Sequence, residues 1–157
     1  MDVLYFLKEE FAIVKHELRG VFGSDSEIFD DDVLASFLDR VELLTKVADD
    51  LILPELAEIS RRGVPELAEA GDQTNSLKRL CVSVRKNRKL SDAKRKEFAG
   101  LVCCHLELME QSILPQFREE ISTQTREDLG LIAIDYRSES SFGLNSKDSK
   151  NWGPLRA

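Results

Sequence analysis

Residues 101–118, LVCCHLELMEQSILPQFR, form an amphipathic helical pattern whose apolar face carries a histidine. His105 lies on that face together with side chains three and four positions apart, the spacing of a buried helical stripe. The other members are apolar or small: Phe98, Leu101, Val102, Met109, Ser112 and Ile113. We therefore predict that His105 points into the core of a helical protein.

A weak internal repeat links this stretch to an earlier part of the chain. The sequence ILPELAE around Pro54 is echoed by ILPQFRE around Pro115. When the two prolines are aligned, His105 falls opposite Leu44. One copy thus has an imidazole at a core position where the other has a hydrocarbon side chain.

Length and composition predict one all-α domain. The chain has 157 residues, enough for a sizeable core, and only 4 prolines and 8 glycines among many good helix formers. Its net charge of −7 disfavours duplex DNA as the main partner. The sequence has neither a signal-peptide pattern nor an apolar run long enough to cross a membrane, so we expect a cytoplasmic protein without a membrane partner.

The three cysteines are expected to be free thiols. Cys103 and Cys104 are adjacent, and their side chains on a helix diverge by about 100°, so a disulfide between them would be strained. We expect two of the three, counting Cys81, to be packed as small hydrophobic side chains.

Apolar side chains at helical spacing predict four long helices and a short fifth one. The first helix is expected over residues 2–22, and the second continues to about residue 62 with a kink at Pro54. A short stretch 66–72 follows, which Gly71 should break from a third helix around residues 77–84. The fourth helix should run from about residue 92 to 121, capped by Ser91 or Asp92, and the fifth covers residues 123–137. Short connections predict an antiparallel up-down-up-down four-helix bundle over residues 1–137. We expect residues 138–157 to be a flexible or loosely docked tail.

The segment between the third and fourth helices is strongly basic. It contains nine cations: Lys78, Arg79, Arg85, Lys86, Arg88, Lys89, Lys94, Arg95 and Lys96. This patch is a candidate docking site for an acidic partner protein, or for an acidic segment such as residues 24–32 of a second copy; the alternative is a solvated helix end and loop. No aromatic residue lies between these cations to stack on bases, so we do not expect nucleic acid to bind.

Four motifs in this order resemble the hemerythrin-like (HHE, cation-binding) domain. They are VLYFLKEE in the first helix, the proline segment late in the second, ILPQF late in the fourth, and EDLG in the last, and they span about residues 2–137. The resemblance implies a four-helix bundle holding two irons. The family's ligands are a histidine on helix one, His-x3-Glu on helix two, a histidine on helix three and a second His-x3-Glu on helix four.

Most of those ligand positions are apolar in this sequence. The helix-one histidine falls on Phe11, the helix-two pair on Leu44 and Ala48, and the helix-four pair on His105 and Met109. Residues 73–104, which cover helix three, contain no histidine. Only His105 could act as a ligand, so we predict no native metal, no cofactor and no catalytic residue, and a dry core that avoids the cost of burying unpaired carboxylates.

Two functions follow from this pattern. The first is a non-enzymatic binding or regulatory module, hemerythrin-like in fold, that has lost its di-iron site. The alternative is an iron-binding hemerythrin-like protein with an altered site around His105, acting in oxygen or redox sensing or in iron handling.

The pattern also predicts a local structure. The apolar ligand positions, with Leu80 from helix three, should lie together near His105. A buried imidazole needs a polar partner, for which we expect a backbone carbonyl, a water molecule or the carboxylate of Glu10.

Overall fold

The computed structural model describes residues 1–22, 31–59, 65–87 and 91–144, and this part of the chain is almost entirely helical and contains no strand. The predicted all-α class is therefore confirmed. The elements are α1 (Val3–Phe22), α2 (Asp31–Val47), the π-helical turn η1 (Ala48–Ile52), α3 (Leu53–Ile59), α4 (Pro65–Lys86), α5 (Asp92–Leu108), the π-helical turn η2 (Met109–Ile113), α6 (Leu114–Glu120) and α7 (Thr123–Leu144). None of the described helices is long and apolar enough to cross a membrane.

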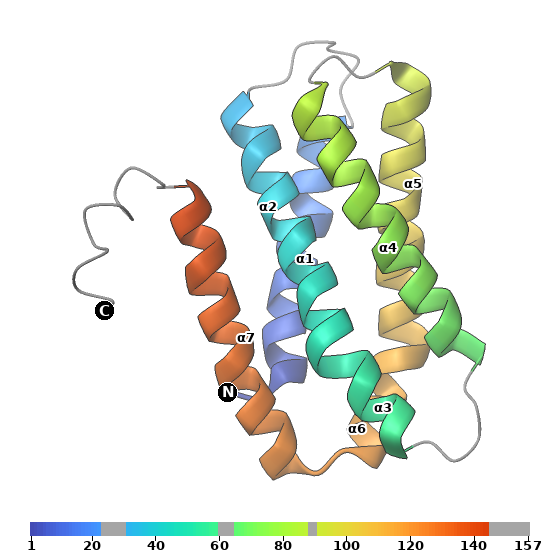
Figure 1. Cartoon of the computed structure of the whole chain (residues 1–157), viewed down its shortest axis with the longest axis vertical. Helices are drawn as coiled ribbons and strands as arrows, with labels where there is room; N and C mark the ends of the chain where they lie inside the picture. The colour runs from blue at the N-terminus through green and yellow to red at the C-terminus, as the bar shows by residue number, and fades with distance from the viewer. Residues whose placement is uncertain (23–30, 60–64, 88–90, 145–157) are drawn as a thin grey trace.

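The long helices lie side by side around one core (Figure 1). α1 packs against α2, α2 against α4, α4 against α5, and α5 against α1. α7 lies outside this ring against α1 and α2.

The predicted stripes supply the core. On α1, Phe11 and Val14 are buried, while His16 is exposed on the opposite side as its position on the helix requires. Phe37 of α2 meets Phe98 of α5 edge to face, with ring centroids 5.9 Å apart, so the core continues across the bundle of helices.

Each proline of the internal repeat follows a π-helical turn. Leu53 N–H donates to the carbonyl of Ala48, and Leu114 N–H donates to the carbonyl of Met109, both five residues back. A proline has no N–H, and its ring collides with the carbonyl four residues earlier in a regular α-helix. The wider π turn gives the ring room. The predicted kink at Pro54 thus takes the form of one extra residue in a turn, and the same form occurs before Pro115.

The two copies of the repeat agree over their whole length. The run α2–η1–α3 and the run α5–η2–α6 have equal element lengths, and every boundary is shifted by the offset that separates Pro54 from Pro115. The alignment that sets His105 opposite Leu44 is therefore also the structural alignment.

Two expected helix boundaries are wrong. α4 runs without a break through Gly71, because Ala70 and Thr74 on either side are fully buried and hold the helix in place. α7 continues to Leu144, so the boundary expected after residue 137 falls inside a helix. There the hydroxyl of Ser140 donates to the carbonyl of Asp39 at 3.4 Å. Residues 145–157 of the expected tail lie outside the described part of the chain.

The start of the chain packs tightly on α7. A Cβ atom added at Gly130 would lie 1.8 Å from the carbonyl oxygen of Met1. Gly130 is therefore required for this close approach, although it costs helix propensity.

Candidate functional site

His105 is buried in the core, as predicted, with 3% of its surface exposed. Its Nδ1 lies 3.0 Å from Oε1 of Gln73 on α4. An amide oxygen only accepts, so Nδ1 carries the proton and donates. Burial lowers the pKa of His105 from 6.5 to about 4, and the nearby negative charge of Asp49 offsets part of that shift. The imidazole is therefore neutral at pH 7.

Glu10 is not the partner of His105, which corrects one of the expected pairings. Its carboxylate is 1% exposed and points toward α2 and α7. Arg40 Nη1 lies 2.6 Å from Oε2, and Arg137 Nη1 lies 3.3 Å from Oε1. This buried ion pair joins α1, α2 and α7. It explains how a carboxylate beside Phe11 can be buried without facing the core centre.

The carboxylate whose charge acts on the pKa of His105 belongs to Asp49 of η1, and this carboxylate is already paired. Thr74 Oγ1 donates to Asp49 Oδ1 at 2.7 Å, and Lys78 Nζ forms an ion pair with Oδ2. The ammonium of Lys78 already balances the charge of this carboxylate and would repel a second cation there.

The family ligand positions lie in the core as hydrocarbon and thioether groups. Phe11, Leu44, Ala48 and Met109 are all less than 5% exposed. Leu80 is only partly buried at the edge of the core. Gln73, rather than Leu80, is the α4 residue that meets His105. No pattern in the sequence points to this residue, because the contact depends on how α4 and α5 are aligned.

These residues do not fit a pair of irons. A di-iron site needs several imidazoles and carboxylates converging on one volume. Among the described residues, no group of three or more histidine, cysteine, aspartate or glutamate side chains could hold a metal ion. The donors nearest the expected site are one imidazole, bonded to an amide, and one carboxylate, paired with a lysine.

The predicted basic patch is partly neutralised by α2 and η1. Lys78 pairs with Asp49. Arg85 bridges two carboxylates, with Nη2 at 2.5 Å from Asp39 Oδ1 and Nε at 2.9 Å from Glu42 Oε1. These cations fasten α4 to its neighbours, so their charge is not free for a partner.

The remaining cations of the patch are divided between two helices. On α5, Lys94 lies 3.7 Å from Glu97, and Arg95 is buried. Besides the paired Lys78 and Arg85, the exposed members within the described residues are Arg79, Lys86, Lys94 and Lys96. Arg88 and Lys89 lie outside the described residues.

Cys81 is not an activated nucleophile. Cys81 is buried, and burial raises the pKa of its thiol to about 12. Cys103 and Cys104 are both exposed, so only one cysteine, not two, is packed as a hydrophobic side chain. A thiol whose pKa is raised is protonated at neutral pH and unreactive.

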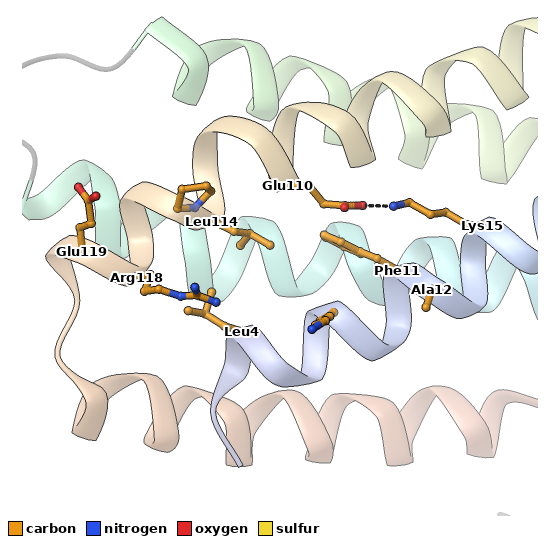
Figure 2. A pocket seen from close by; sticks show the side chains of 10 residues that line it. Leu4, Phe11, Ala12, Lys15, Glu110, Leu114, Arg118 and Glu119 are labelled. Carbon is orange, nitrogen blue, oxygen red and sulfur yellow. Dashed lines mark ion pairs between the residues drawn. The ribbon is translucent and has the colours of Figure 1, made fainter.

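A groove that the sequence did not reveal lies between α1 and the run η2–α6 (Figure 2). Its cavity has a volume of about 640 Å³. The lining consists of Leu4, Lys8, Phe11, Ala12, Lys15, Glu110, Leu114, Pro115, Arg118 and Glu119. A second hollow of about 400 Å³ shares Lys15 and Glu110 and continues along α1 past Leu18 and Arg19. The groove can be found only from the structure, because it is formed by residues about a hundred positions apart.

No protein-family model, curated protein or solved structure matches the chain.

Proposed function

We propose that the protein is a hemerythrin-like domain that has lost its di-iron site and acts as a non-enzymatic binding module. The observation that carries this proposal is the replacement of the ligand set as a whole. Phe11, Leu44, Ala48 and Met109 are all buried and apolar, and His105 is neutral and bonded to Gln73. A core that no longer holds metal must not retain unpaired carboxylates, and these replacements satisfy that requirement.

The proposal includes the arrangement of the helices. The closed sequence of contacts α1–α2–α4–α5–α1 supports an antiparallel up-down-up-down four-helix bundle, with α7 as an additional helix on its outside. The repeat supports the same reading, since α1 with α2–η1–α3 and α4 with α5–η2–α6 are two similar helical hairpins. Phe11 and Gln73 are each the ninth residue of the first helix of their hairpin.

The alternative function is a metal site built around His105, in sensing or iron handling. The observation in its favour is that the charge of Asp49 acts on the imidazole. Against it stand the partners that both groups already have, Gln73 for the imidazole and Thr74 with Lys78 for the carboxylate.

Metal analysis separates the two functions. Protein purified from iron-supplemented cells should contain far less than one iron per chain, and its melting curve should coincide with that of chelator-treated protein. His105→Leu is the matched variant, because leucine is the residue that the first copy of the repeat has at the equivalent position, Leu44. Iron bound at one or more per wild-type chain and lost in His105→Leu would establish the alternative and reject our proposal.

A further inference from the structure

The groove between α1 and η2–α6 lies beside the π turn η2. α5 packs against α1, but beyond η2 the chain turns away, and α6 packs against α3. Leu114 and Pro115 begin α6 at this point and line the groove. An extra residue in a helical turn often occurs at a functional site, because it redirects the side chains that follow.

The floor of the groove is apolar. Leu4 and Phe11 of α1 face Leu114 of α6 across it, with Ala12 at the side (Figure 2). The cavity volume of about 640 Å³ lies in the range of ordinary small-molecule sites. An apolar chain lying on this floor would be removed from water on one side along its whole length.

The charges on the rim are not balanced. Lys15 and Glu110 pair with each other at 2.5 Å at one end of the groove. Glu119 points away from α1 (Figure 2). Two cations remain, Lys8 and Arg118, and neither side chain has an ion pair or hydrogen bond with another described residue. The Arg118 side chain extends from α6 toward Leu4 at the end of the groove opposite the Lys15–Glu110 pair.

We propose that this groove binds an amphiphilic carboxylate, such as a medium-chain fatty acid. The carboxylate would lie at Arg118 and Lys8, where a guanidinium can bind both oxygens. The alkyl chain would lie over Leu4 and Phe11 toward the Lys15–Glu110 pair. The length of α1 from Leu4 to Lys15 corresponds to about 16 Å at 1.5 Å per residue, enough for an extended medium-length chain.

This inference rests on the proposed function as a binding module, but of the ligand positions that the resemblance assigns, the lining of the groove includes Phe11 and not Leu44, Ala48, His105 or Met109. The two proposals can therefore fail separately. Iron in the purified protein would reject the metal-free core without touching the groove, and a groove that binds no fatty acid would leave the metal analysis unchanged.

The test is isothermal titration calorimetry of the full chain with dodecanoate, below its micellar concentration. We expect saturable binding of one molecule per chain and no saturable binding of dodecyltrimethylammonium, which has the same chain and the opposite charge. Arg118→Gln and Lys8→Gln should each weaken dodecanoate binding by about tenfold, the effect of losing one charge-assisted contact. Lys96→Gln is the control, since it removes an exposed cation of α5 that does not line the groove.

A steric variant tests the position of the alkyl chain. Ala12 is exposed, so Ala12→Trp should fold normally while it fills the groove and abolishes binding. The absence of saturable binding to folded wild-type protein would overturn the proposal. So would equal affinity for the alkyl cation, an equal loss in Lys96→Gln and Arg118→Gln, or full binding by Ala12→Trp.

Discussion

Replacing His105 with leucine should remove a defined part of the acid sensitivity of the protein. The pKa of His105 falls from 6.5 to about 4 on folding, mainly because the imidazole is buried. Below pH 6.5 the unfolded chain binds a proton at this position while the folded chain does not, so stability is lost as the pH falls from about 6.5 toward 4. Each pKa unit corresponds to 1.36 kcal/mol, and the shift of about 2.5 units therefore amounts to roughly 3 kcal/mol at pH 4.

His105→Leu has no group that titrates in this range. At pH 7 the variant should be close to the wild type in stability, because the imidazole is neutral there and its partner Gln73 is only half-buried and can be hydrated. At pH 5 the variant should be more stable than the wild type by about 2 kcal/mol. The difference between the two proteins should thus grow as the pH decreases.

Urea unfolding followed by far-UV circular dichroism, repeated at several pH values from 7 to 4.5, measures this difference. His16→Gln is the matched control: His16 is exposed on α1, so its removal should leave the pH profile parallel to that of the wild type. Parallel profiles for wild type and His105→Leu would show that burial does not lower the pKa of the imidazole, and would refute the assignment of a neutral core histidine.

Three further outcomes are expected. Gly71→Ala should stabilise the protein by up to about 1 kcal/mol, because Gly71 is helical and the added Cβ meets no neighbouring element within 4 Å. Gly130→Ala should instead lower the melting temperature, because its Cβ would collide with the carbonyl of Met1. An increase of the melting temperature in both variants would contradict the close approach at Gly130. Glu10→Gln should lower the free energy of unfolding by about 2 kcal/mol in urea titrations, since it removes the charge that two arginines share; an unchanged midpoint would mean that the buried ion pair contributes nothing. A thiol reagent should label two cysteines in the native protein and Cys81 only after unfolding, and rapid native labelling of all three would contradict the burial of Cys81.

The features that could be predicted from the sequence are those that one helix determines by itself. The apolar stripe of α1, the inward direction of His105 and the outward direction of His16 follow from helical spacing alone. The cap of α5 is equally local: the Ser91 hydroxyl accepts from Lys94 N–H at 3.3 Å.

The features that were missed depend on contacts between helices. The partner of His105 is Gln73, which only the register between α4 and α5 selects. Gly71 was expected to end a helix by propensity, but the burial of its neighbours outweighs roughly 1 kcal/mol of helix preference. Pro54 predicts a kink, but neither proline of the repeat predicts the π turn by which the helix accommodates it, because one added residue barely changes the apolar pattern.

The same π turn occurs in both copies of the repeat, but the surroundings of the two turns differ. η1 and η2 have the same length and the same proline after them, so α3 and α6 leave their parent helices in the same way. In the first copy α3 packs against α4. In the second copy the space between α6 and α1 forms the groove, and Lys8 and Arg118 lie on its rim. Because the turn is common to both copies, the groove also depends on the side chains that line it, among them Ala12 of α1 and Leu114 and Pro115 of α6. Leu4 and Phe11 on its floor are themselves buried, so the accessible apolar surface of the groove comes mainly from Ala12, Leu114 and Pro115.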